Sequence, residues 1–324
     1  MREARMATYP KPFKDIPSLL LLLQQRGLSI PDAARAARCL QRIGYYRLSG
    51  YWYPLRNSRA DHSGRMIIEE DFRPGATFAQ VADLYVFDKK LRLHFLDAIE
   101  RVEIAIRIKI AEILGRRDPL AYLNASELHG NFSRKAAKGP THHERWLANY
   151  RRSEERSKED FIAPFLSSHP GFEFPMWMAV EFWDFGNLSH FLPGMKIQDR
   201  SSLANEFGLL REDLLLSWVR AIHTVRNTCA HHSRLWNRPL ADNPKPPKVG
   251  DSPLLDHLAN DPHAQTRLYA IAVALQFLIR SDQPTSQWSD RLKQLVSSFP
   301  AGPNLSIKQG AGFPENWERL AIWN

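Results

Sequence analysis

Apolar residues recur every three or four positions over most of the chain, the spacing that places them on one face of an α-helix. The pattern is longest between 77 and 114, where it steps from Leu84 through Ile99 to Ile113 and predicts one long core helix, broken at most once. The same spacing occurs in four shorter stretches, at 31–46, 197–207, 212–236 and 262–279. Alternation of apolar and polar residues, which is typical of strands, is almost absent. We therefore expect an all-α helical bundle.

Two stretches interrupt this helical pattern. Residues 57–75 are rich in Asn, Ser, Asp and Gly, and they predict a connection with a short hairpin around 66–68. Residues 237–253 contain five prolines and predict an extended, polyproline-like arm. The chain is accordingly expected to have three parts: a basic, aromatic-rich N-terminal segment at 1–75, a helical core at 76–285 with an inserted basic loop at 129–160 and the Pro-rich arm, and a C-terminal tail at 286–324.

The composition is that of an ordinary folded protein, with 44% hydrophobic and 24% charged residues in 324 positions. The two cysteines, Cys39 and Cys229, lie far apart in the sequence, which argues against a disulfide framework and a cysteine-based zinc site. Apolar stretches all fall short of the roughly 20 residues that a membrane span needs. The N-terminal region also lacks the apolar core of a signal peptide. We expect a cytoplasmic protein with no membrane partner.

The net charge of +9 is unevenly distributed. Residues 1–60 hold eleven basic side chains against three acidic ones, and residues 134–158 hold eight against three. Concentrated positive charge is typical of surfaces that bind a phosphate backbone. The charge pattern therefore favours a nucleic-acid partner.

Aromatic residues are interleaved with arginines in the first basic block. Such a block suits unpaired RNA, because rings stack on exposed bases while guanidinium groups contact the backbone. The candidate RNA-binding residues are Arg42, Tyr45, Tyr46, Arg47, Tyr51 and Trp52 in this block, and Arg134, Lys135, Lys138, Arg151 and Arg152 in the second. The alternative is that the rings pack in the core while the arginines reach outward.

Four arginines, three histidines and two asparagines are concentrated between 218 and 238. On a helix, His223, Asn227 and His231 form one polar stripe beside an apolar one. Arg226 and His231 are five positions apart, about 140° on an ideal helix, so they converge on one phosphate only through helix distortion or across two copies of the chain. This spacing favours a homodimer.

These residue types suit RNA cleavage by attack of the ribose 2′-hydroxyl on the adjacent phosphate. An imidazole takes or returns a proton near neutral pH. Arg226 would bind the phosphate and stabilise the charge that builds up on it. Such a reaction requires no metal and no other cofactor.

A further polar group lies on the predicted long helix. Glu100, Glu103 and Arg107 share one face, and Glu103 precedes Arg107 by four positions, the favourable order for an ion pair. Exposed pairs of this kind are common and weak, so a solvated surface pair is one interpretation. His232 is either a second acid or base, or a hydrogen-bond donor at the helix end.

Other motifs are missing or have a structural explanation. His142 and His143 lie in the basic loop without a partner at metal-ligand spacing, and the chain has no HExxH or Cys-rich pattern. It also has no Gly-rich phosphate loop and no GxSxG. Trp177, Trp183 and Phe185 are expected in the core.

The segment 225–238, VRNTCAHHSRLWNR, resembles the signature of the AbiD/AbiF-like abortive-infection (Abi) family of bacterial phage-defence proteins. Segments 43–52, 96–107 and 175–188 agree with that family in the expected order. The family is similar in turn to the HEPN superfamily, whose Arg-x4-6-His motif forms a metal-independent ribonuclease site, usually across a homodimer.

This resemblance implies a HEPN-like helical bundle with additional N-terminal helices and irregular basic loops. It implies that Arg226 and His231 are catalytic, that Asn227 accompanies them, and that a carboxylate on the long helix orients Arg226 or a histidine. The candidate auxiliary residues are Glu100, Glu103, Arg107, His223 and His232. The expected function is that of an abortive-infection endoribonuclease toxin, held in check by a small RNA or protein antitoxin. The alternatives are a non-catalytic RNA-binding scaffold and, less well matched to the aromatic block, a DNA-binding regulator.

Overall fold

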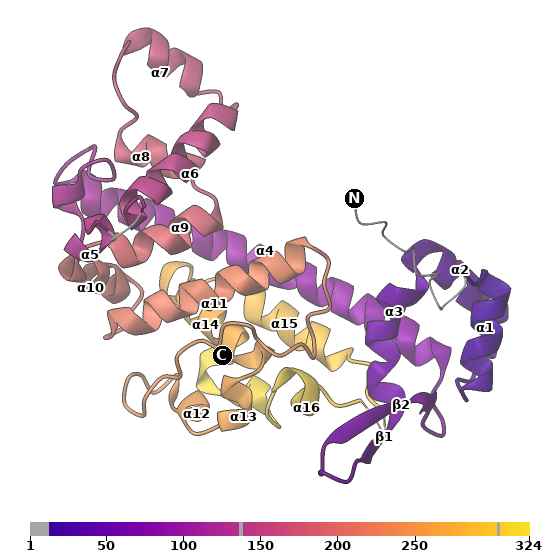
Figure 1. The fold of residues 1–324 in the computed structure, drawn as a ribbon. Coiled ribbons are helices and arrows are strands. Elements are labelled where there is room, and N and C mark those ends of the chain that lie inside the picture. Colours follow the sequence, from indigo (N-terminus) through magenta and orange to yellow (C-terminus); the bar gives the residue numbers. More distant parts are fainter. Residues whose placement is uncertain (1–12, 136–138, 303–304) are drawn as a thin grey trace. The chain divides into compact units, whose positions relative to one another are not determined.

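The computed structural model describes residues 13–135, 139–302 and 305–324. These residues form sixteen α-helices and one two-stranded antiparallel sheet, so the all-α prediction is confirmed (Figure 1). The chain divides into two compact units. The described parts of Met1–Lys89 and Ser298–Ser306 make the first unit, and Lys90–Ser297 with Ile307–Asn324 make the second. The expected boundaries at 75 and 285 lie 14 and 12 residues before these divisions.

The first unit contains short helices, a hairpin and the beginning of a long helix. Its elements are α1 (Ile16–Gln25), α2 (Ala33–Ile43), α3 (Tyr45–Trp52), a 3₁₀ turn at Tyr53–Leu55, β1 (Arg56–Ala60), β2 (Met66–Phe72) and the start of α4 (Phe78–Gly115). Asp32 caps α2 by accepting a hydrogen bond from the backbone of Arg35. Gly44, at φ 90°, separates α2 from α3, where the sequence predicted one helix to residue 46. The hairpin is longer than the one expected at 66–68.

The second unit holds the rest of α4 and the remaining helices. They are α5 (Gly130–Ser133), α6 (His142–Arg156), α7 (Ile162–Ser168), α8 (Met176–Ala179), α9 (Phe185–Phe191), α10 (Ile197–Glu206), α11 (Glu212–Ala230), α12 (Asp256–Ala259), α13 (Pro262–Gln265), α14 (Leu268–Asp282), α15 (Trp288–Ser297) and α16 (Ile307–Ala311). Short 3₁₀ turns lie at Ala125–Glu127, Val180–Phe182, Leu192–Gly194, Trp317–Arg319 and Ala321–Trp323.

The core of this unit is built around α14. Every residue from Leu268 to Ile279 is buried, because the helix is apolar on all sides. Helix α11 packs against α14 with its own apolar face and also contacts α9 and α10. Helix α4 is unbroken over 38 residues, as its periodicity predicted. The opposite face of α11 is left for polar side chains.

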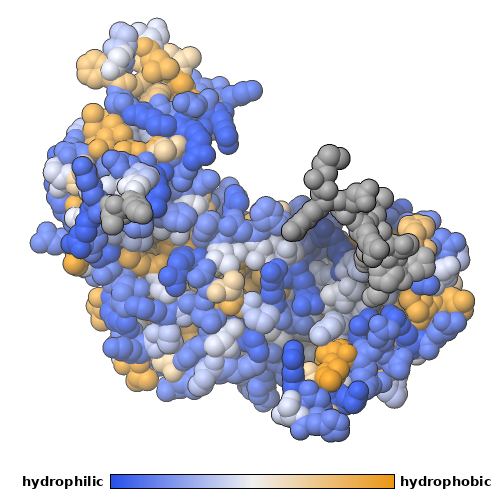
Figure 2. All heavy atoms as spheres, in the orientation of Figure 1, coloured by the Kyte–Doolittle hydropathy of each residue, from blue (hydrophilic) through white to orange (hydrophobic). Residues whose placement is uncertain are grey.

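Four sequence predictions in this unit are wrong. The basic loop expected at 129–160 is largely helical, because Thr141 and Glu144 cap α6 and α5 precedes it. The helix expected at 262–279 is divided into α13 and α14. The helix expected at 212–236 ends at Ala230. Trp177, expected in the core, is 55% exposed, whereas Trp183 and Phe185 are buried as predicted. Apolar side chains are also exposed around α7, among them Leu166 and Phe172. Figure 2 shows hydrophobic surface over this part of the chain.

Candidate functional site

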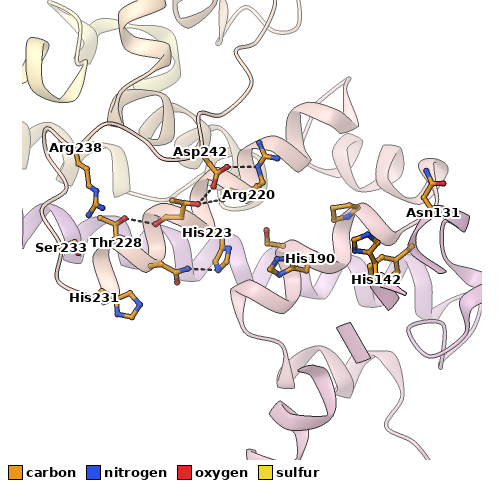
Figure 3. Close-up of a pocket in the computed structure, with 15 residues that line it drawn as sticks. Asn131, His142, His190, Arg220, His223, Thr228, His231, Ser233, Arg238 and Asp242 are labelled. Carbon is orange, nitrogen blue, oxygen red and sulfur yellow. Dashed lines mark hydrogen bonds and ion pairs between the residues drawn. The ribbon is translucent and has the colours of Figure 1, made fainter. Parts of the chain in front are cut away.

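A cavity of about 810 Å³ lies beside the polar face of α11, entirely within the second unit (Figure 3). Its walls come from α5, α6, α9, the C-terminal half of α11 and the segment that follows α11. The residues lining it are Asn131, Phe132, His142, Ser189, His190, Pro193, Arg220, His223, Thr224, Asn227, Thr228, His231, Ser233, Arg238 and Asp242. All three residues of the predicted stripe, His223, Asn227 and His231, therefore face one cavity.

The C-terminal end of α11 places His231 at this cavity. His232 adopts the left-handed conformation at φ 56°, and its N–H donates to the carbonyl of Cys229 at 3.0 Å. The N–H of Ser233 donates to the carbonyl of Thr228 at 3.0 Å, which completes a Schellman turn. Glycine or asparagine usually occupies this position, so a histidine here is uncommon. The turn ends the helix and leaves His231 exposed at its end, rather than on a helical face as the sequence predicted.

Arg226 lies next to the cavity and contacts it through Asn227. Its guanidinium faces the Asn227 side-chain oxygen at 3.5 Å, and the Asn227 amide nitrogen is 3.1 Å from His223 Nε2. Asn227 lines the cavity while Arg226 does not. Within the described residues, Arg226 and His231 form no hydrogen bond with each other.

His223 on α11 is held against α9. Its ring stacks on that of Phe185, with the ring centroids 5.9 Å apart, and meets the ring of His190 edge-on, with the centroids 6.3 Å apart. Burial lowers the pKa of His223, and the charges of His190 and Arg226 lower it further, whereas Asp184 and Asp242 act in the opposite direction. His223 is therefore predominantly neutral at neutral pH.

Glu103 on α4 lies close to Arg226. Its carboxylate pairs with Arg107, and the two side chains are only 14% and 16% exposed, so they are not the solvated surface pair of the alternative interpretation. Burial raises the pKa of Glu103, while the charges of Arg107 and Arg226 oppose that rise. Glu100 is exposed on the same helix. Of the predicted carboxylates, Glu103 is the one placed to act on Arg226.

Several lining residues were missed by the sequence analysis. Asp242 accepts from the Thr224 hydroxyl at 2.7 Å and pairs with Arg220 at 3.3 Å, which fastens the Pro-rich segment to α11. His190 donates from Nδ1 to the Gly186 carbonyl at 2.7 Å. His142, set aside for lack of a partner, is exposed at the start of α6 and reaches the same cavity. These residues carry no local motif, since only the folded chain brings them to α11.

The predicted RNA-binding residues of the first basic block divide into two groups. Tyr51 and Trp52 are 2% and 0% exposed, so the prediction that they stack on bases is wrong, because their faces pack in the core of the first unit. Tyr46 is 81% exposed. Arg42 and Arg47 are also exposed, and Tyr45 is half-buried against Trp52, with their ring centroids 4.9 Å apart.

The second basic block is partly neutralised. Arg151 pairs with Glu154 and, through two hydrogen bonds of 2.7 and 2.6 Å, with Glu173, so its charge is already balanced within the chain. Arg152 is exposed, and it donates to the Ala148 carbonyl and to Asn149. Arg134 and Lys135 are exposed, whereas Lys138 lies outside the described residues.

Two further features of the described residues bear on the class of protein. No helix there is both long and apolar enough to cross a membrane. Within the same ranges, no three His, Cys, Asp or Glu side chains are grouped as a metal site requires. Fold and site together define a helical protein with a histidine-, asparagine- and arginine-bearing cavity.

Comparison with known families identifies the chain more closely. The model of the Abi-like protein family matches residues 38–237, and the chain belongs to that family. Its membership associates the protein with abortive infection, the bacterial defence against phage. The matched range includes the whole of α11 and ends before the Pro-rich segment. No curated protein and no solved structure matches the chain.

Proposed function

We propose that the chain is a metal-independent endoribonuclease of the HEPN type that acts as an abortive-infection toxin. The observation that carries this proposal is the convergence of His223, Asn227 and His231 on one cavity, with Arg226 directly behind Asn227. The Abi-like family supports the setting of phage defence. The exposed, positively charged residues of both basic blocks suit an RNA substrate.

In this mechanism the scissile phosphate lies at Asn227, between the guanidinium of one copy of the chain and the exposed imidazole of a second copy. Arg226 attracts the phosphate and stabilises the negative charge that builds up when the 2′-oxygen attacks phosphorus. His231 moves a proton between the reacting oxygens and solvent. The products are a 2′,3′-cyclic phosphate and a free 5′-hydroxyl. Glu103 holds Arg226 through charge.

We also propose that two copies of the chain work together. Arg226 and His231 are not hydrogen-bonded to one another within the described chain, and a two-fold partner would bring each imidazole to the other copy's guanidinium. A small RNA or a protein antitoxin would then act by covering the cavity or separating the copies.

The test is cleavage of RNA by purified protein in EDTA, using variants of the site and matched controls elsewhere. We expect Arg226→Ala and His231→Ala to reduce cleavage at least 100-fold, and thermal unfolding of His231→Ala to be unchanged. His62→Ala and Arg65→Ala remove the same side-chain types from an exposed turn of the first unit and should leave cleavage unchanged.

The result also decides between an enzyme and a scaffold. Wild-type protein that binds RNA tightly without cleaving it would refute the nuclease proposal and favour the RNA-binding scaffold. Full cleavage by the double variant of Arg226 and His231 would refute the assigned site.

A further inference from the structure

The orientation of the Asn227 side chain follows from the chemistry of its two neighbours. Arg226 has only N–H donors, so the group of Asn227 that faces it must be the carbonyl oxygen, 3.5 Å away. The amide NH₂ then faces His223, 3.1 Å from Nε2. An NH₂ group donates, so Nε2 must accept. This orientation corresponds to neutral His223 with its proton on Nδ1.

The surroundings of His223 favour this neutral form. His190 and Asp184 face it from α9, Arg226 from its own helix, and Asp242 from the segment after α11. A Cβ at Gly186 would meet Asp184 Oδ1 at 3.0 Å, whereas its 3.5 Å distance to His223 Nε2 would be an ordinary contact. Burial, together with the effects of His190 and Arg226, outweighs the two carboxylates and lowers the pKa of His223.

We propose that His223 is a positioning residue that holds Arg226 in place through Asn227; this inference rests on the proposed function of Arg226 as the phosphate-binding group. Neutral His223 accepts from the Asn227 amide, which turns the amide oxygen toward Arg226. Arg226 is then oriented from two sides, by Asn227 on its own helix and by the charge of Glu103 on α4.

Protonation of His223 breaks this arrangement. An imidazolium carries N–H on both nitrogens and cannot accept from Asn227. The amide must turn over, which places its NH₂ against the guanidinium of Arg226. Because the pKa of His223 is lowered from 6.5, the arrangement is intact at neutral pH and is lost as the pH falls below that range.

This effect opposes the general electrostatic trend. Protonating other histidines at low pH adds positive charge and strengthens RNA binding. A loss of affinity that depends on His223 is therefore specific to the proposed arrangement.

The experiment measures binding rather than cleavage, so that its failure is distinguishable from failure of the nuclease proposal. A fluorescent 2′-O-methyl RNA of twelve nucleotides, which cannot be cleaved by its own 2′-hydroxyls, is titrated from pH 7.5 to 4.5 by anisotropy. His231→Ala is the parent protein, so that His231 does not titrate. His223→Gln supplies a side-chain oxygen that accepts from Asn227 at every pH, and His223→Leu supplies no acceptor.

We expect the affinity of the parent to fall about three- to tenfold over this range, which corresponds to about 0.7 to 1.4 kcal/mol. The His223→Gln variant should keep its affinity, and the His223→Leu variant should bind at pH 7.5 as weakly as Arg226→Ala. Identical pH dependence in parent and His223→Gln would overturn the proposal. Nitrogen NMR of the wild type is a check that needs no variant, and a proton on Nε2 of His223 at pH 7 would also overturn it.

Discussion

The charged group behind the cavity predicts an asymmetric response to mutation. Glu103 and Arg107 are 14% and 16% exposed, and Arg226 is a second cation near the same carboxylate. Burial raises the pKa of Glu103 despite both arginines, which means that the cost of removing the carboxylate from water exceeds their attraction. Replacing the carboxylate with an uncharged side chain of the same shape therefore removes slightly more desolvation cost than attraction.

We expect Glu103→Gln to change the free energy of unfolding at pH 7 by less than about 1 kcal/mol. Arg107→Met should lower the free energy of unfolding by about 2 to 3 kcal/mol, because it leaves the buried Glu103 carboxylate with one cation. This cost is smaller than that of breaking a fully buried ion pair, because Arg226 remains. The raised pKa of Glu103 also determines how its contribution to stability depends on pH. Glu103 contributes stability below its ordinary pKa of 4.5, and that contribution is lost as the pH rises through the raised value.

Urea unfolding followed by tryptophan fluorescence measures both changes, with Glu100→Gln as the exposed control on the same helix. Cleavage should nevertheless fall at least tenfold in Glu103→Gln, because Arg226 loses the charge that holds it. Equal destabilisation by Glu103→Gln and Arg107→Met would refute this reasoning. So would full cleavage by Glu103→Gln.

Three further predictions follow from burial and packing. Burial lowers the pKa of His94, which stacks on Trp288, to about 4, so the unfolded chain binds a proton that the folded chain does not. Between pH 7 and pH 5 the free energy of unfolding of the wild type should therefore fall by about 2 kcal/mol more than that of His94→Leu in urea unfolding, and equal losses would contradict this. Gly194→Ala should lower the free energy of unfolding by about 1 to 3 kcal/mol, because its Cβ would lie 2.4 Å from the Phe132 ring in the cavity wall. The control Gly115→Ala would place a Cβ 3.5 Å from its nearest neighbour and should leave thermal unfolding unchanged. Tyr46→Ala should weaken RNA binding by about 1 to 3 kcal/mol without changing stability. Trp52→Ala should instead lower stability by about 3 to 5 kcal/mol, and the reverse pattern would contradict the assigned burial.

Local periodicity was enough to predict the helices that make the core. Helices α4 and α14 carry long apolar patterns, and tertiary packing only adjusts their ends. The end of α11 could not be predicted in the same way, because the left-handed turn at His232 uses a residue that rarely marks a helix end. Helix α2 ends where Gly44 turns the chain, a signal that the sequence did contain.

The residues of the candidate site also fall into a group that local spacing predicts and a group that it does not. The stripe of His223, Asn227 and His231 follows from helical spacing, and the structure places all three at the cavity. His190 and Asp242 come from other elements, so their approach to α11 depends on packing that a single sequence does not reveal. The aromatic block could not be resolved from the sequence either, because exposed and buried rings occur together within the short helix α3.

The central claim is that Arg226 and His231 cleave RNA without a metal. The most direct measurement is end-group analysis of RNA incubated in EDTA with wild-type protein and with His231→Ala. The account predicts fragments ending in 2′,3′-cyclic phosphate from the wild type and intact RNA from the variant. Intact RNA in both reactions, or identical fragments in both, would contradict it.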